Sequence, residues 1–64
     1  MTPGDTIYFV GKGGVISTGV LLEIVRVEKD DEPASGFVRS GSMCYAAPVI
    51  FATEEELKKY FNLL

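Results

Sequence analysis

A long run of alternating residues between Val15 and Glu28 constrains this chain more than any other feature. Side chains at every second position of a strand point to the same face, and the run offers two such sets. One set is Ile16, Thr18, Val20, Leu22 and Ile24, and the other is Ser17, Gly19, Leu21, Glu23 and Val25. Because 14 residues exceed the usual length of a strand, we expect one long strand that bends at Gly19. Bent strands of this kind build small barrels.

Shorter segments with the composition of strands lie on either side of this run. Residues 6–10 (TIYFV) are rich in β-branched and aromatic types and predict the first strand. Residues 37–39 predict a short third strand, followed by a turn at residues 40–42. Residues 43–51 predict one or two further strands. Pro48 cannot donate a ladder hydrogen bond, so we expect its strand to lie at an edge of the sheet or to break there.

The end of the chain predicts a helix over residues 53–63. Thr53 and Glu56 have the spacing of a capping box, in which each side chain bonds an otherwise free amide at the helix start. Two acidic and basic pairs at a spacing of four support the same helix, Glu54 with Lys58 and Glu55 with Lys59. One face of the helix carries an apolar stripe of Leu57, Phe61 and Leu64. We expect this stripe to cover one open end or face of a barrel.

The length of the chain limits it to a single hydrophobic core. A chain of 64 residues buries only about 60% of its unfolded surface, so all its elements must share that core. We therefore expect residues 1–64 to form one mainly β domain, a small barrel of four to five antiparallel strands with a C-terminal helix. The hydrophobic fraction of 47% is more than so small a core can hide. The excess predicts contact with a protein partner or with a second copy of the chain.

Three stretches follow one another in a recognisable order: GDTIYFV, then after a glycine turn VISTGVLLEI, and finally IFATEEEL. This order resembles that of short bacterial and phage-encoded SH3-like barrel proteins. In these, a G-D-x-V/I-Y strand and a G-x-V-x-x-I strand precede a closing strand that leads into an F-x-T-x-E-E helix start. The chain departs from the pattern in the middle, where it has GFVRSGS. The resemblance implies an SH3-like barrel and assigns no activity to any residue, because such barrels serve many tasks.

The glycine-rich segment Gly11-Lys12-Gly13-Gly14 allows two interpretations. A phosphate-binding P-loop needs a hydroxyl residue after its lysine and a helix after that, whereas here Val15 begins a strand. Glycines between two strands supply the positive φ angles of hairpin turns, so we interpret the segment as a turn. The alternative is a ligand-contacting loop, because successive amides of such a turn can form an anion nest. In that case Lys12, Gly13 and Gly14 would contact a phosphate together with Arg39.

Residue types needed for chemistry are scarce in this chain. It contains no histidine, the commonest general base and a common metal ligand. Its single cysteine, Cys44, lies between Met43 and Tyr45, and we interpret it as a small apolar strand residue rather than a reactive thiol. We expect no enzyme activity, no bound metal and no cofactor.

The segment from residue 28 to residue 36 is charged and rich in turn-forming residues, which predicts an exposed loop. Asp30, Asp31 and Glu32 are adjacent there. They lack the spaced oxygen ligands and the glycine of a calcium-binding loop. We therefore interpret these carboxylates as solvated.

The charge of the chain disfavours nucleic-acid binding. Nine acidic residues outweigh six scattered basic ones, for a net charge of −3, although Lys12, Arg26 and Arg39 could still converge in the fold. A single cysteine fits a reducing cytosol, and no signal segment is apparent. The longest uncharged run, from Ser40 to Thr53, is shorter than the roughly 20 apolar residues of a membrane-spanning helix. We expect a cytoplasmic protein that does not enter a membrane.

These observations favour a non-enzymatic protein-interaction module, for which we consider an accessory or inhibitory role in a phage or mobile element. We expect its contact surface to comprise Tyr8, Leu21, Glu23, Val25 and Tyr45. A one-residue bulge in the long strand would exchange the two faces on which this choice depends.

Three other functions remain open from the sequence. One is a small-ligand or nucleotide-binding oligomer that uses the GKGG loop. The second is a nucleic-acid-binding barrel, and the third is a purely structural subunit of a larger assembly.

Overall fold

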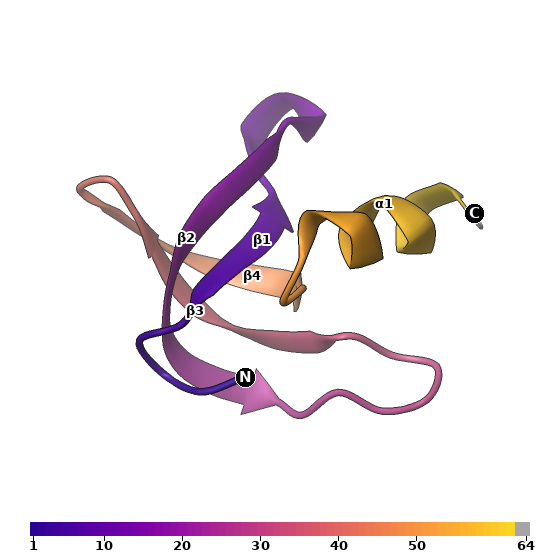
Figure 1. Cartoon of the computed structure of the whole chain (residues 1–64). Helices are drawn as coiled ribbons and strands as arrows, with labels where there is room; N and C mark the ends of the chain where they lie inside the picture. Colours follow the sequence, from indigo (N-terminus) through magenta and orange to yellow (C-terminus); the bar gives the residue numbers. More distant parts are fainter. Residues whose placement is uncertain (63–64) are drawn as a thin grey trace.

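A computed structural model describes residues 1–62 as one antiparallel sheet followed by a helix (Figure 1). The strand order in the sheet is the order in the sequence, β1-β2-β3-β4. The elements are β1 (Thr6–Val10), β2 (Ile16–Arg26), β3 (Ala34–Ser40), β4 (Met43–Ile50) and α1 (Glu54–Asn62). A mainly β fold with a C-terminal helix is therefore confirmed.

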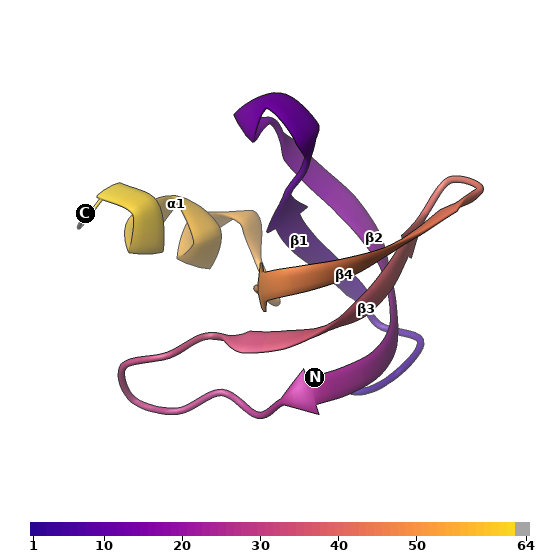
Figure 2. The same cartoon turned by 180° about the vertical axis from the view of Figure 1, so that it is seen from behind.

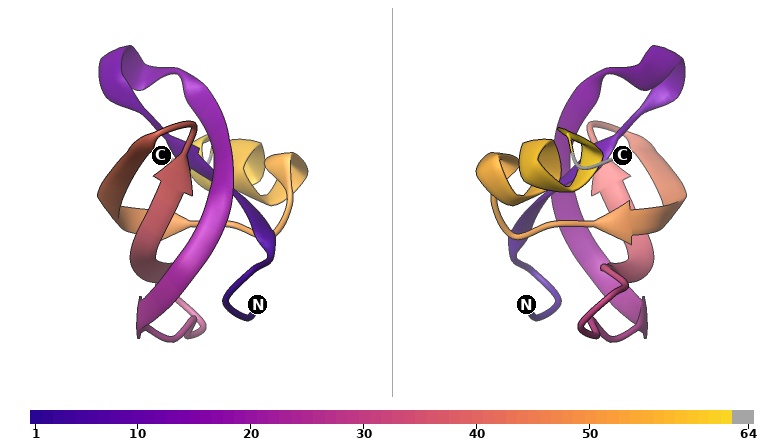
Figure 3. Two further views of the ribbon diagram at one scale, coloured as in Figure 1. Left: turned by 90° about the vertical axis from the view of Figure 1, so that its left-hand side faces the viewer. Right: turned by 90° about the vertical axis from the view of Figure 1, so that its right-hand side faces the viewer.

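The long strand β2 curves through the molecule and pairs with β1 on one side and with β3 on the other (Figure 3). A Cβ atom added at Gly19 would lie 2.8 Å from the carbonyl oxygen of Arg39 and 3.3 Å from the ring of Phe9. Glycine therefore allows the close approach that the curvature needs. Two register shifts follow, between Leu21 and Glu23 and between Ile24 and Arg26.

The inner face of the curved sheet carries the core. Ile7 and Val38 are fully buried, and the helix adds Leu57, which is 2% exposed. The other buried apolar residues are Phe9, Leu21, Ala34, Ala47, Ile50 and Phe51. Burial of these side chains is the main source of stability in so small a fold.

The sheet is not closed into a continuous barrel. Beyond β4, Phe51 forms one isolated antiparallel bridge to Tyr8 in β1. The Tyr8 amide donates to the Phe51 carbonyl oxygen at 2.8 Å, and the Phe51 amide donates back at 2.9 Å. One bridge thus brings the end of the last strand to the first strand, and the remaining parts of the two edges stay unpaired with each other.

The predicted bounds of the middle strands were wrong. β3 begins at Ala34 instead of residue 37, so its first residues belonged to the predicted loop. A Cβ atom at Gly36 would collide with the carbonyl oxygen of Glu23. The strand therefore needs a glycine at this position, although glycine is more typical of turns. β4 runs without a break through Pro48, and the irregularity appears instead as a register shift against β3 between Ala34 and Gly36. Pro48 does lie on an edge strand, as predicted.

The helix begins where the capping residues predicted. The Glu56 amide donates to Thr53 Oγ1 at 3.1 Å, whereas a hydrogen bond from the Thr53 amide to the Glu56 carboxylate is not among those of residues 1–62. Glu54 and Lys58 form an ion pair of 3.4 Å. In the predicted stripe, Leu57 is buried and Phe61 is 39% exposed, and Leu64 lies outside the described residues.

Candidate functional site

One residue of the predicted contact surface, Leu21, is in the core. It is 1% exposed and lies opposite Val38 on the inner face, so its assignment to a contact surface was wrong. Glu23 and Val25 are exposed, as expected for that surface. Three residues at alternate positions therefore do not share a face.

The cause is the pair of bulges in β2. Leu21 pairs with Val38, and the next pair joins Glu23 to Phe37, so Leu22 is an extra residue in the ladder. An extra residue reverses the inward and outward sense of the residues that follow it, here as far as the second shift between Ile24 and Arg26. Gly19 and Leu21 thus face inward before the bulge, and Ile24 packs against the core after it. A bulge of the kind that would exchange the two faces is therefore present, and it lies within the candidate surface itself.

The outer side of β2, β3 and β4 carries a cluster of exposed apolar residues. We call Val25, Phe37, Ala46 and Pro48 the outer patch; they line a shallow hollow of about 420 Å³. Val25 is 63% exposed and Phe37 is 43% exposed. Phe37 lies opposite Glu23 on β2 and opposite Ala46 on β4. Side chains from three strands thus form one apolar surface with a carboxylate at its border.

The two tyrosines of the predicted surface occupy different places. Tyr8 is half-buried at the bridge to Phe51. Tyr45 lies opposite Val38 on the inner side, with its ring 6.0 Å from that of Phe9, and it is 42% exposed. Neither tyrosine lines the outer patch.

The GKGG segment forms the predicted turn between β1 and β2. The Gly14 amide donates to the Gly11 carbonyl oxygen at 3.1 Å, and Gly13 and Gly14 have φ angles of 80° and 77°. Lys12 borders a hollow of about 310 Å³ that Ser17, Ser40 and Tyr45 also line. The structure thus brings Lys12 close to the turn between β3 and β4.

Arg39 is not part of that hollow. It follows the inward-facing Val38 in β3 and pairs with Cys44 and Val20, which places it on the outer side of the sheet. Arg26 lies at the opposite end of β2, where it bonds the carbonyl oxygen of Pro33. The three basic residues named from the sequence therefore occupy separate places.

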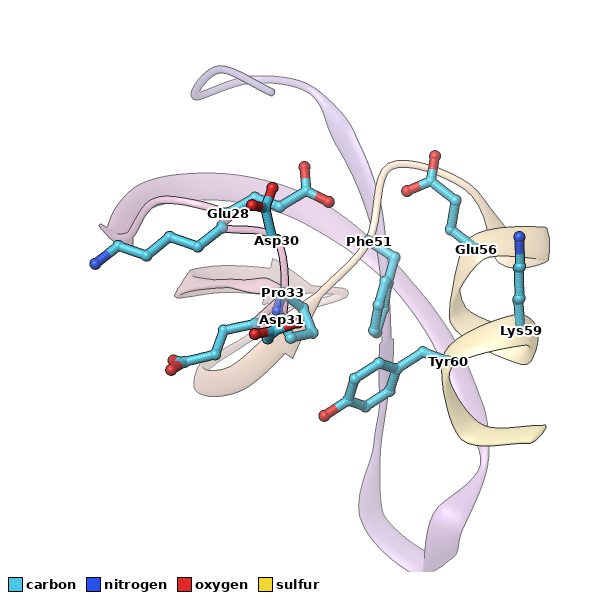
Figure 4. Close-up of a pocket in the computed structure, with 10 residues that line it drawn as sticks. Glu28, Asp30, Asp31, Pro33, Phe51, Glu56, Lys59 and Tyr60 are labelled. Carbon is cyan, nitrogen blue, oxygen red and sulfur yellow. The ribbon is translucent and has the colours of Figure 1, made fainter. Parts of the chain in front are cut away.

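A third hollow, of about 350 Å³, separates the loop after β2 from the helix (Figure 4). The rings of Phe51 and Tyr60 lie 5.4 Å apart at its base, and Glu56 and Lys59 border it on the helix side. The loop contributes carboxylates, among them Asp30 and Asp31. Within residues 1–62, no group of three acidic or cysteine side chains comes together in a way that could hold a metal ion.

Cys44 lies in β4 as a free and exposed cysteine. The sequence correctly placed it in a strand. In the part of the chain that the structure describes, no helix is long and apolar enough to cross a membrane.

Comparisons of the chain with protein-family models, with curated proteins and with solved structures found no match. The assignment of function therefore depends on the surfaces described above.

Sequence reasoning missed most of the outer patch. Phe37 was assigned to a strand but not to a surface, and Ala46 and Pro48 were treated as parts of an interrupted strand. Alternation along β3 contained a usable signal, because Phe37 and Val38 are adjacent apolar residues of one strand and only one of them can face the core. The pairing of Phe37 with Ala46 could not be derived without the register.

Proposed function

We propose that this chain is a protein-binding module that acts without catalysis and that uses the outer patch as its contact surface. The observation that supports the proposal is the gathering of Val25, Phe37, Ala46 and Pro48 from three strands around one exposed hollow. Aromatic and apolar side chains at the centre of a surface are typical of protein interfaces. A rigid sheet also presents them at little cost in conformational entropy.

The charges beside the patch indicate the kind of partner. Glu23 lies opposite Phe37, and the acidic loop with Asp30 and Asp31 follows β2 beyond Val25. We propose a protein partner whose apolar contact surface is bordered by basic side chains, because charges of opposite sign across the rim guide association. The proposal includes an SH3-like barrel as the fold type, a cytoplasmic location, and an accessory or inhibitory role in a phage or mobile element.

Capture of a partner with matched variants tests this function. Tagged wild-type protein, Phe37→Asp, Val25→Asp and the control Thr18→Asp are each incubated with soluble proteins of the source cells. Thr18 is also exposed on β2 but does not line the hollow. A carboxylate in the centre of an apolar interface must be desolvated on binding, so we expect the two patch variants to bind at least about tenfold more weakly.

A partner that is lost with both patch variants and retained by Thr18→Asp supports the proposal. A partner retained by all variants contradicts it, and so does the absence of any captured protein. Circular dichroism of each variant ensures that a loss of binding is not a loss of folding.

A second candidate function is binding of a small anionic ligand in the hollow beside Lys12. The observation that favours it is the convergence of Lys12, Ser17, Ser40 and Tyr45 on one hollow from two separate hairpins. NMR titration with inorganic phosphate and with ATP tests it. Shifts of the Gly13 and Gly14 amides that disappear in Lys12→Ala would support the candidate, and unchanged spectra would contradict it.

A further inference from the structure

The strand β4 has a free edge. It is the last strand of the sheet, and β3 pairs with only one of its sides. The turn between β3 and β4 has two residues, with Gly41 at a φ of 64° in the first position. In a hairpin with such a turn the hydrogen-bonded pairs alternate, beginning with the pair next to the turn, Ser40 and Met43. Cys44 and Ala46 therefore direct their backbone N–H and C=O groups away from β3.

Between Met43 and Ala46 this edge lacks the features that usually prevent edge strands from pairing with another chain. Charged side chains, above all lysine, are the commonest protection, but the segment from Ser40 to Thr53 contains no charge. Met43 is 57% exposed and Tyr45 is 42% exposed on the same strand. The hairpin turn also projects from the side of the sheet opposite α1, where no other described element covers it (Figures 1 and 2). Pro48 protects only the far end of the strand.

The other edge of the sheet is partly occupied. The bridge between Tyr8 and Phe51 uses both backbone groups of Tyr8 on the outer side of β1. A second strand that paired along β1 would have to break this bridge. The bridge therefore blocks β1 at its centre, and an association that uses the same β4 edge in both molecules ends with two molecules instead of continuing into a fibre.

We propose that β4 pairs antiparallel with β4 of a second copy of this chain, across a two-fold axis. Because the segment contains no charge, two copies of it do not repel each other. A charged peptide, in contrast, would find no opposite charge there. An edge whose only specific features are backbone donors and acceptors is complementary to itself in the antiparallel direction.

The free backbone groups also define the register. With the axis at Tyr45, Cys44 lies opposite Ala46 of the second copy, and Ala46 opposite Cys44 of the second copy. Both pairs then have their N–H and C=O groups directed at each other. With the axis at Cys44, Ala46 would lie opposite Ser42 of the second copy, which belongs to the turn. With the axis at Ala46, Cys44 would lie opposite Pro48 of the second copy, which has no N–H. The axis at Tyr45 is therefore the register that makes most use of the edge.

Oligomeric state and a charge exchange test this pairing. Sedimentation velocity is measured over a concentration series for the wild type, Cys44→Lys, Ala46→Glu, the double variant and the control Thr18→Lys. Each single variant places two like charges near the axis, so we expect the dissociation constant of the dimer to rise at least about tenfold. In the double variant each introduced lysine lies opposite the introduced glutamate of the second copy, and we expect the dimer to return. Thr18→Lys changes a position away from the edge and should leave the dimer unchanged.

Thiol cross-linking gives a second readout in the unaltered protein. In this register the two Cys44 residues are diagonal neighbours, roughly 7–8 Å apart with their Cβ atoms somewhat closer. A short bismaleimide should therefore join two wild-type chains at low protein concentration.

Three outcomes overturn the proposal: a wild type that stays monomeric throughout the series, single variants that dimerise as tightly as the wild type, and a double variant no tighter than the single ones. The dimer does not depend on partner binding by the outer patch, because Phe37→Asp changes no backbone group of the edge. A protein that dimerises and captures no partner would contradict only the proposed function.

Discussion

The guanidinium group of Arg26 joins β2 to Pro48 in β4, with a hydrogen bond of 3.2 Å from Nη2 to the Pro48 carbonyl oxygen. The same group donates to the carbonyl oxygen of Pro33, from Nη2 at 3.0 Å and from Nε at 3.3 Å. Pro33 lies just before β3, and Pro48 lies where the register of β4 shifts against β3. One side chain thus supplies donors at the end of the sheet where the regular ladder is broken.

We expect Arg26→Met to lower the free energy of unfolding by about 1.5 kcal/mol, because it removes charge-assisted hydrogen bonds and keeps the apolar stem. Glu32→Gln removes only the exposed ion pair of 3.5 Å to Arg26, and we expect it to cost less than about 0.5 kcal/mol. Urea denaturation measures both values. Equal losses for the two variants would mean that the carboxylate, and not the proline carbonyl oxygens, is the important partner of Arg26.

Gly36→Ala should be among the most damaging single-methyl changes in this chain. The added Cβ collides with the backbone carbonyl oxygen of Glu23, which cannot move without disturbing the ladder, so we expect a loss of at least about 2 kcal/mol. Gly13→Ala is the matched comparison: its Cβ meets no atom within 4 Å, but its φ is 80°, and we expect a loss of about 1 kcal/mol. Thermal denaturation would contradict the assignment if Gly13→Ala were the more harmful change.

Leu21 and Val25 differ in burial although both belong to the same alternating set. Leu21→Ala should lower the free energy of unfolding by about 3 kcal/mol, because it leaves a cavity in the core. Val25→Ala at an exposed site should change it by less than about 0.5 kcal/mol. Similar losses in chemical denaturation would show that the strand does not have the bulge at Leu22.

Local signals in the sequence were enough to predict much of the fold. Thr53 and Glu56 predicted the start of α1, and the glycines around Lys12 predicted the first hairpin. Pro48 predicted either an edge strand or a break, and the first of these was found. Each of these depends on residues that are close together in the chain. Backbone angles, caps and missing donors are properties of a few neighbouring residues, so they can be read without knowing the rest of the fold.

The candidate site was harder to predict because it depends on register. The two bulges in β2 are fixed by pairing with β3. The residues next to Leu22 give no sequence signal for an extra residue in the ladder. The length of β3 was underestimated because Gly36 reads as a turn residue, although its role is to let two backbones approach. Neither fact is visible until the partner strand is known, so Leu21 was assigned to the surface and Phe37 was left out.

Asp5 should make stability depend on pH in the acid range. Its carboxylate accepts hydrogen bonds from the Thr2 amide at 2.9 Å and from the Thr2 hydroxyl at 3.2 Å, and these hold the pKa of Asp5 below its usual value. Because the folded-state pKa is the lower one, the stabilisation is present above the usual carboxyl pKa and is lost as pH falls through the folded-state pKa. We expect Asp5→Ala to lower the melting temperature at neutral pH and to have little effect in strong acid. A difference between wild type and variant that stays constant with pH would show that the charge of Asp5 is not involved.

The bridge between Tyr8 and Phe51 has a consequence for the speed of folding. About two thirds of the chain separates these residues. The two hydrogen bonds that join them therefore stabilise the fold only after a long loop has closed. The hairpins on either side of the acidic loop can form early from neighbouring residues. The barrier to folding should therefore lie in docking one hairpin against the other. Phe51→Ala keeps the two backbone hydrogen bonds and removes the buried side chain beside them, so its folding rate should show whether packing at this late contact limits the rate.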